Sequence, residues 1–233
     1  MRKKVSDRIL YEDNHLVVVT KEAGELVQPD VTGDRTLADD VKEYLKVKYS
    51  KPGNVYLGLP HRIDRPTTGI VVFCKTDKAL SRMSASFRTS EVRKTYWAIV
   101  DRKPDKSEAT LVHYLVRNPE SNKSIAYPVE RNGSKLAKLS YRLLASSDNY
   151  HLLEIDLHTG RHHQIRAQLA AVGIHIKGDL KYGAARSNPD GGICLHSRRL
   201  VFTHPVRKTL VDITAPVPGD RLWQWFASEL GTL

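Results

Sequence analysis

Apolar residues recur along the chain at two spacings, one typical of strands and one typical of helices. Short β-branched runs bounded by turn residues predict strands at 9–11, 16–20, 70–75, 92–100, 109–116, 140–144, 150–157, 193–203 and 209–214. Apolar residues three and four positions apart predict helices that begin near residues 36, 77 and 159, and a last helix over 218–230. Many neighbouring strands are joined by tight turns. This order favours an α+β fold with a mixed, largely antiparallel central sheet flanked by helices.

The expected helix boundaries depend on capping residues. Thr36 is expected to cap the first helix, Asp77 the second, and Thr159 with Gly160 the third. We expect the third helix to bury Ile165, Leu169 and Val172, and the last to bury Leu222, Trp225, Phe226 and Leu230. The segments 118–124 and 181–192 are expected to be a polar turn and a Gly-rich loop.

Composition limits the classes of protein to consider. The 233 residues are 40% hydrophobic, enough for a core, and we expect one domain over 1–233 with room for two sub-lobes around a central cleft. Lys and Arg number 37 against 26 acidic residues, a net charge of +11. That balance predicts a polyanionic partner, and a solvated basic surface is the alternative. No apolar run reaches the roughly 18 residues of a membrane span.

Cysteine usage and the N-terminus indicate the compartment. Cys74 and Cys194 lie in apolar runs, without the spacing of metal ligands. Buried reduced thiols are typical of cytoplasmic proteins. The first ten residues lack the apolar core of a signal peptide. We therefore expect a cytoplasmic protein.

The stretch 59–70, LPHRIDRPTTGI, is the first candidate for chemistry. It sets Asp64 among His61, Arg62 and Arg65, and its two prolines and glycine predict a fixed loop before a strand. Neighbouring guanidinium charges favour the ionised carboxylate. Such an acid suits a nucleophile or base that acts on a negatively charged substrate. A turn aspartate paired with arginine is the structural alternative.

A second candidate stretch is 157–179, where basic residues gather at a predicted helix start. It contains His158, Arg161, His162, His163, Gln164 and Arg166. A helix start presents backbone N–H groups and favours phosphate or carboxylate. Arg166 borders the apolar stripe, so it needs an anionic partner, for which Asp64 is a candidate. A metal site made by His158, His162, His163 and His175 is disfavoured, because no carboxylate or cysteine has ligand spacing and the arginines repel a divalent ion.

Tyr96 is the third candidate. It lies within the predicted strand KTYWAIV, where its side chain points opposite to that of Trp97. An ordinary core tyrosine is one interpretation. The other is an aromatic surface for a nucleobase.

Four ordered motifs resemble those of the RluA-type pseudouridine synthases. HRIDRPTTG is similar to the catalytic motif of that family, and the others are ILYEDNHLVVVTKEAG, RKTYWAIV and LHTGRHHQIRAQLAAVGIHIKGDLKYG. ICLHSRRLVFTHP also resembles a late strand of the family, and the resemblance spans 8–216. The departures are Glu22, Arg65-Pro66, Thr68 and His162. They affect loop shape or RNA preference and leave the assigned catalytic positions intact.

The resemblance implies a role for each candidate. Asp64 is the essential acid at the sugar of the target uridine, Arg166 pairs with its carboxylate, and Tyr96 stacks on the base and assists proton removal. Arg62 replaces the flipped nucleotide in the stack. The residues expected to bind RNA are Arg62, His61, Arg161, His163 and Gln164. The small N-terminal RNA-binding domain of several relatives is expected to be absent.

The implied reaction breaks the bond to nitrogen 1 of an extruded uridine, rotates the uracil and rejoins it through carbon 5. The carboxylate either attacks the anomeric carbon or takes a proton from the neighbouring sugar carbon, and both routes stay open. The expected enzyme uses no cofactor or metal, acts as a monomer and modifies ribosomal or transfer RNA. A non-catalytic RNA-binding or RNA-folding module is the alternative. A glycosidase is disfavoured because no second acid stands near Asp64.

Overall fold

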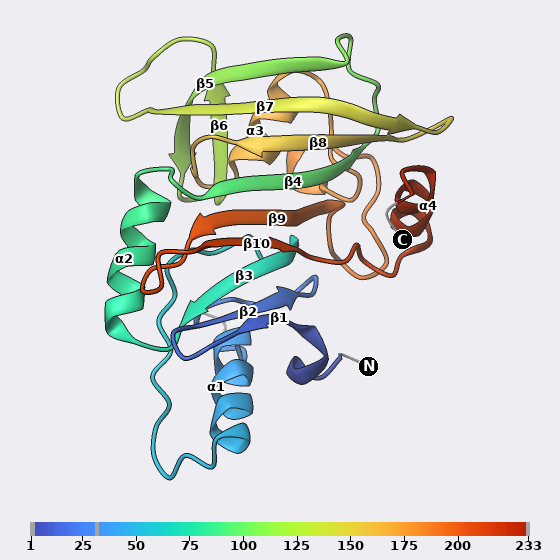
Figure 1. The fold of residues 1–233 in the computed structure, drawn as a ribbon. Coiled ribbons are helices and arrows are strands. Elements are labelled where there is room, and N and C mark those ends of the chain that lie inside the picture. Colours follow the sequence, from blue (N-terminus) through green and yellow to red (C-terminus); the bar gives the residue numbers. More distant parts are fainter. Residues whose placement is uncertain (1–2, 31–32, 232–233) are drawn as a thin grey trace. The chain divides into compact units, whose positions relative to one another are not determined.

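The computed structural model describes residues 3–30 and 33–231. The chain divides into two compact units, one made of 1–92 with 199–216 and the other of 93–198 with 217–233. The strand β9 (Leu195–Thr203) contributes its first residues to the second unit and its remaining residues to the first. The ribbon in Figure 1 labels the elements of both units.

The first unit is built from strands that pair antiparallel. β1 (Ile9–Glu12) pairs with β2 (Leu16–Lys21), β2 pairs with β3 (Thr68–Cys74), and β10 (Leu210–Thr214) pairs with the end of β9. An isolated parallel bridge joins Leu26 to Thr36. The helices of this unit are η1 (Val5–Arg8), α1 (Leu37–Lys48) and α2 (Asp77–Arg88). The strands and helices that we predicted here are confirmed.

Both faces of β2 and β3 are buried. One face packs against Ala79 and Met83 of α2 and carries Leu16, Val18, Ile70 and Val72. The other face carries Val17, Val19, Val71 and Phe73, all 0% exposed. Because side chains alternate along a strand, burial on both faces requires the continuous apolar runs that the sequence shows.

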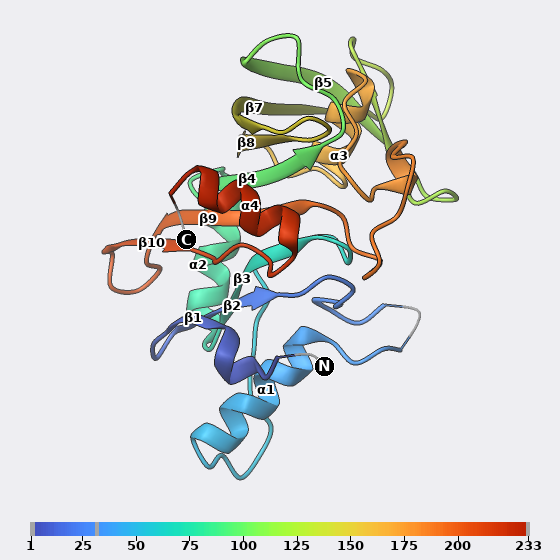
Figure 2. The same ribbon diagram turned by 90° about the vertical axis from the view of Figure 1, so that its right-hand side faces the viewer.

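The second unit is an antiparallel sheet with the strand order β4-β8-β7-β5-β6. Its strands are β4 (Arg93–Val100), β5 (Glu108–Asn118), β6 (Lys123–Tyr127), β7 (Lys135–Ser146) and β8 (His151–Leu157). The helices are α3 (Gln164–Ala171), η2 (Leu180–Tyr182) and α4 (Arg221–Glu229). Ala167 of α3 packs on Leu115 and Ala137 of the sheet. Figure 2 shows α3 beside the strands of this sheet. The α+β prediction, with a largely antiparallel sheet, is confirmed.

Strand β6 was not predicted from the sequence. It overlaps the expected turn at 118–124, because the strand already begins at Lys123. Its burial is inverted: Ser124 is 4% exposed, whereas Ile125 is 45% exposed. A strand with a polar residue inside and an apolar residue outside lacks the alternation that identifies strands in a sequence.

Two predicted helix starts were wrong. Thr76 caps α2 in place of Asp77, since its hydroxyl accepts the backbone N–H of Ala79 at 3.3 Å. α3 begins at Gln164 and not at Thr159, and its N-cap is His163, in the left-handed region with φ 51°. The loop 159–163 therefore belongs to the candidate site and not to the helix.

Two predicted apolar stripes were only partly right. Ile165 and Leu169 of α3 are buried, but Val172 is 41% exposed. On α4 the buried residues are Trp223, Phe226 and Ala227, while Trp225 is 39% exposed. The buried residues of α4 are also three and four positions apart, so the helical spacing was right and the buried face was misassigned.

The start of α1 carries the expected cap in its complete form. The Thr36 hydroxyl accepts the backbone N–H of Asp39 at 3.2 Å, and the Asp39 carboxylate accepts the backbone N–H of Thr36 at 3.1 Å. This reciprocal pair is a capping box. Thr36 is 1% exposed, so water does not replace a lost partner readily.

Replacing Thr36 by Ala should lower the free energy of unfolding by about 1 kcal/mol, because the first turn of α1 loses its hydroxyl acceptor. Thr36→Ser keeps that hydroxyl and is the matched control. Urea denaturation of both variants measures the effect. Equal losses in the two variants would show that the methyl group, and not the cap, stabilises this position.

Candidate active site

Asp64 lies in the first unit, on a turn that leads into β3. The carbonyl of Asp64 accepts the backbone N–H of Thr67 at 3.0 Å and closes the turn. Thr67 is 2% exposed and Ile63 is 8% exposed, whereas Asp64 is half-buried. The chain on both sides of the acid is thus packed, and the acid itself meets the surface.

A buried ammonium group holds this turn. Lys21 is 0% exposed, and its Nζ donates to the carbonyls of Arg65 and Thr67, each at 2.7 Å, and to that of Glu22 at 3.0 Å. A buried cation needs such acceptors, and carbonyl dipoles supply them here. Gly24 adds a further tie, since its N–H donates to the Arg65 carbonyl at 3.0 Å.

Two of the basic neighbours of Asp64 have contacts with other parts of the first unit. Arg65 forms an ion pair with Asp34 at 2.8 Å and donates to the Gly24 carbonyl at 3.1 Å. The Nε2 atom of His61 accepts the backbone N–H of Val72 at 3.0 Å, and its ring stacks on Phe87 at a centroid distance of 4.2 Å. His61 and Arg65 thus brace the loop.

Arg62 differs from these two neighbours. It is exposed, and within residues 3–30 and 33–231 its side chain has no hydrogen bond or ion pair. Its guanidinium group is therefore available to a partner from outside the chain.

Tyr96 lies in the second unit, in the middle of β4. It is 8% exposed and pairs across the sheet with Ile155. The next residue, Trp97, points to the other face, where its indole N–H donates to Glu154 at 3.3 Å and the Arg198 guanidinium lies 4.6 Å from its ring. Lys94 lies two residues before Tyr96 and therefore shares its face.

Arg166 is held by a carboxylate that the sequence analysis did not select. Its Nε and Nη2 atoms donate to the two oxygens of Asp179 at 2.6 and 2.7 Å, and the residues are 5% and 1% exposed. Its guanidinium also lies 4.9 Å from the Tyr182 ring. This fork fixes the direction of the side chain. Its pairing with Asp64, which lies in the other unit, stays a prediction.

Gln164 uses its whole side chain to hold the loop 159–163. Its Oε1 atom accepts the Thr159 hydroxyl at 2.8 Å and the backbone N–H of Arg161 at 3.0 Å. Its Nε2 atom donates to the Lys138 carbonyl at 3.1 Å and to Gln168 at 2.9 Å. An amide has two donors and two acceptor sites, and all four are used. Gln164 therefore positions this loop, and the expected direct contact with RNA would break existing bonds.

His163 packs within a polar cluster beside Arg166. Its ring stacks on His162 at a centroid distance of 3.8 Å, and its Nδ1 atom lies 2.9 Å from the Tyr182 hydroxyl. Burial, reinforced by the Arg166 charge, lowers the pKa of His163 to about 2. His163 is therefore neutral at pH 7 and offers RNA no positive charge. Arg161 is exposed, and its Nε donates to the Leu136 carbonyl at 3.0 Å.

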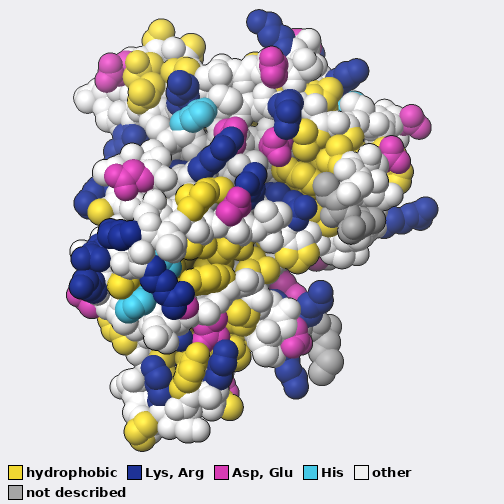
Figure 3. All heavy atoms as spheres, viewed as in Figure 1, with side chains coloured by type: hydrophobic (Ala, Val, Ile, Leu, Met, Phe, Trp, Pro, Cys, Tyr) yellow, Lys and Arg dark blue, Asp and Glu magenta, His cyan; other side chains and the backbone are white. Residues whose placement is uncertain are grey.

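Other features of the described chain do not form a site. In the described part of the chain no three His, Cys, Asp or Glu side chains are placed to hold a metal ion. No helix there has both the length and the apolar content of a membrane span. Lys and Arg side chains occur across the face drawn in Figure 3, with acidic side chains between them.

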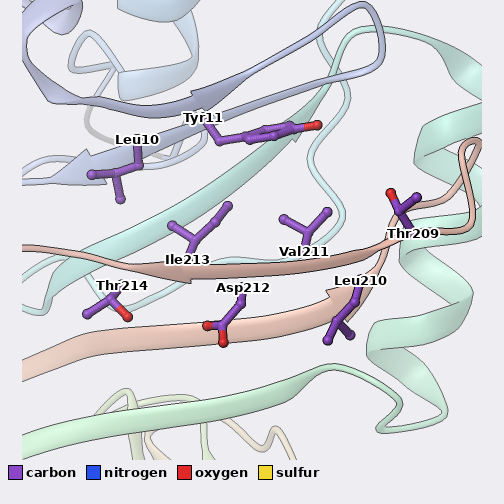
Figure 4. A pocket seen from close by; sticks show the side chains of 8 residues that line it. All are labelled: Leu10, Tyr11, Thr209, Leu210, Val211, Asp212, Ile213 and Thr214. Carbon is purple, nitrogen blue, oxygen red and sulfur yellow. The ribbon is translucent and has the colours of Figure 1, made fainter.

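A pocket of about 420 Å³ lies in the first unit (Figure 4). Its lining comes from Leu10, Tyr11 and residues 209–214. The one carboxylate among these residues, Asp212, is already paired with the Nε of Arg199 at 2.7 Å. This pocket therefore holds none of the candidate residues and is not the site.

Comparison with known proteins identifies the family. The family model described as RNA pseudouridylate synthase matches residues 15–171. The chain belongs to this family. The matched region includes the Asp64 turn, Tyr96 and Arg166. The chain is thus an RNA pseudouridine synthase, an intramolecular isomerase.

Individual relatives agree with this assignment. The chain is 33% identical over 222 residues to ribosomal large subunit pseudouridine synthase D of Zymomonas mobilis, covering 91% of this chain and 69% of the relative. It is 30% identical over 220 residues to the uncharacterized RNA pseudouridine synthase YhcT of Bacillus subtilis, with the same coverage of 91% and 69%. The solved structure of human RNA pseudouridylate synthase domain containing 4 has a TM-score of 0.78 and 24% identity, covering 97% of this chain and 94% of that one. The last comparison confirms the fold.

Replacing Lys21 by Met should loosen the Asp64 turn, because the carbonyls of Arg65 and Thr67 lose a common donor. We expect the free energy of unfolding to fall by roughly 1–3 kcal/mol. We also expect faster hydrogen exchange at the Thr67 amide. Lys46→Met, at an exposed position on α1, is the control. Unchanged exchange at Thr67 would contradict the role of the ammonium group.

Acid should destabilise the second unit through His163. The folded state holds this ring neutral down to about pH 2, whereas the unfolded chain protonates it near 6.5. Stability is therefore fully present above pH 6.5 and is lost as the pH falls, by up to about 1.4 kcal/mol per pH unit. His163→Asn, which suits a left-handed backbone, should flatten this dependence between pH 4 and 6.5. His158→Asn, at an exposed position, should leave it unchanged.

Proposed function

We propose that this isomerase converts a specific uridine of ribosomal or transfer RNA to pseudouridine, with Asp64 acting on the sugar. The observation that carries the proposal is the set of hydrogen bonds from the buried Lys21 ammonium to the Asp64 turn. It fixes the backbone of the Asp64 turn through the carbonyls of Arg65 and Thr67, while the acid meets the surface. A carboxylate carried on a fixed backbone can be positioned against one atom of a bound nucleotide.

The chemistry needs one carboxylate and no external reagent. The bond between nitrogen 1 of uracil and the anomeric carbon breaks, the base rotates, and carbon 5 forms the new bond. The proton on carbon 5 then leaves to a base, and nitrogen 1 takes up a proton, so that the product is an isomer of the substrate. Asp64 either forms a covalent bond to the anomeric carbon, which breaks when carbon 5 attacks, or removes a proton from the adjacent sugar carbon and returns it when the new bond forms. The free uracil must be shielded from water during the rotation.

Each remaining candidate has a proposed role. Tyr96 stacks on the uracil, and Arg62, exposed and unpaired in the described chain, replaces the flipped nucleotide in the RNA stack. Arg166, oriented by Asp179 and Tyr182, pairs with the Asp64 carboxylate. His61 and Arg161 contact the RNA backbone. Gln164 and the neutral His163 act on RNA through the shape of the loop 159–163.

Ribosomal RNA is the favoured substrate, since the Zymomonas relative is named for the large ribosomal subunit. The charge of +11 supports a polyanionic partner. Cys74 and Cys194 are both free and buried, which suits a reducing compartment such as the cytoplasm.

The decisive test compares Asp64→Asn with the native enzyme on RNA from cells that lack the gene. Pseudouridine formation at the mapped site should fall by about 10²–10⁴-fold or more, because the reactive carboxylate is lost while its shape is kept. RNA affinity should change by no more than a few-fold. Asp105→Asn, at an exposed position, is the control. Equal product from Asp64→Asn and native enzyme would overturn the proposal.

A further inference from the structure

Lys94 is a buried cation without a partner. It lies at the start of β4 and is 7% exposed. Within residues 3–30 and 33–231, no group accepts a hydrogen bond from its ammonium group or pairs with it. Burying an unpaired charge is unfavourable by several kcal/mol in general, so natural proteins rarely keep one without a use.

The nearest charge makes this position less favourable still. Arg161 lies close enough for its positive charge to act on Lys94, and it adds to burial in lowering the pKa of the Lys94 ammonium. Arg161 is anchored through its Nε to the Leu136 carbonyl at 3.0 Å, and its terminal nitrogens have no acceptor among the described residues. Two cations thus lie near one another, and neither the Lys94 ammonium nor the terminal nitrogens of Arg161 have an acceptor among the described residues.

The space beside Lys94 is open. A Cβ atom built on Gly160 would lie 4.0 Å from the Lys94 Nζ and would meet no other atom within that distance. Gly160 is exposed, so the region communicates with solvent. The loop around it is held in shape by Gln164, through the Thr159 hydroxyl and the Arg161 backbone. A small anion can therefore enter from outside and reach the ammonium group.

Lys94 also lies on the same sheet face as Tyr96. Two residues along a strand are about 7 Å apart, which is within the reach of a single nucleotide. If Tyr96 stacks on the uracil, as proposed above, the phosphates that flank the target nucleotide fall near Lys94. An ammonium group and an arginine fork are the side chains that proteins use to hold phosphate.

We propose that Lys94 and Arg161, with the gap at Gly160, bind a phosphodiester next to the flipped uridine. The site is a phosphate anchor for the substrate and takes no part in bond making. This inference rests on the proposed function, because it identifies the phosphate as one of the RNA substrate. Free inorganic phosphate offers the same chemistry, and the experiment separates the two sources.

The first test uses Lys94→Met, which keeps the length of the side chain and removes its charge. We expect a higher melting temperature for the free protein, because an unpaired buried charge is gone, and roughly tenfold or greater loss of affinity for the substrate RNA. The slope of log affinity against log salt should become shallower by about 0.7–0.9, the value of one phosphate contact. Lys106→Met, an exposed position in the same unit, removes the same charge and should change affinity no more than twofold.

Gly160→Ala tests the gap while both cations remain. The added methyl group fits without a clash, since its only neighbour within 4.0 Å is the Lys94 Nζ. The melting temperature should stay constant, while RNA affinity falls as it does in Lys94→Met. A Gly160→Ala variant that binds RNA like the native enzyme would overturn the proposal.

The source of the phosphate is tested with an oligonucleotide that carries the mapped uridine and one neutral methylphosphonate on either side. One of the two substitutions should weaken binding to the native enzyme and have no effect on Lys94→Met. If inorganic phosphate raises the melting temperature of native enzyme only, and both substitutions act equally on the two proteins, the RNA anchor is disproved.

A lower melting temperature with unchanged RNA affinity in Lys94→Met would assign the residue a purely structural role. These outcomes leave the Asp64 test untouched, so the two proposals can fail separately.

Discussion

The contact on which the first unit depends is the one between the buried Lys21 ammonium and the carbonyls of Arg65 and Thr67. An ammonium group taken out of water must find acceptors, and a backbone turn can supply several at once. The need is mutual, because the carbonyls of a turn packed against β3 need donors, and the Lys21 ammonium supplies one to each of these two. A single buried charge at the end of β2 therefore fixes the turn that carries Asp64, without any contact to the acid being required.

In the second unit a buried ion pair between Arg166 and Asp179 has the corresponding supporting role. Arg166 on α3 is fixed by the Asp179 fork, and Tyr182 contacts both its guanidinium and the His163 ring. Burial and the Arg166 charge lower the pKa of His163 and keep its ring neutral. In each unit a buried ionic or polar contact thus supports a candidate catalytic residue. Lys21 fixes the turn that carries Asp64, and Asp179 fixes the Arg166 side chain.

The sequence predicted most of this architecture because strand alternation, helix stripes and the Thr36 cap are local signals. It did not predict β6, where Ser124 is buried and Ile125 exposed, nor the late start of α3 at Gln164. Both depend on tertiary contacts. The Tyr182 hydroxyl accepts the Ser124 N–H at 2.7 Å from 58 residues away, and Gln164 at the start of α3 donates to the Lys138 carbonyl at 3.1 Å. The candidate residues could be selected by motif. Their supports, Lys21 and Asp179, could not, because a buried charge looks like a surface charge in a sequence.

The buried Lys and Arg residues of the described chain differ in whether a protein group accepts their hydrogen bonds. Arg8 pairs with Glu25 at 2.7 Å, Lys21 has its carbonyls, and Arg166 has Asp179, so these three support the fold. Lys94 is the fourth buried cation in the described residues, and nothing in them satisfies it. The first three show how readily this chain supplies an acceptor when a buried charge is structural. An anion that binds beside Lys94 supplies the acceptor that the folded chain does not. The unsatisfied charge therefore stabilises the complex with an anionic ligand relative to the ligand-free enzyme.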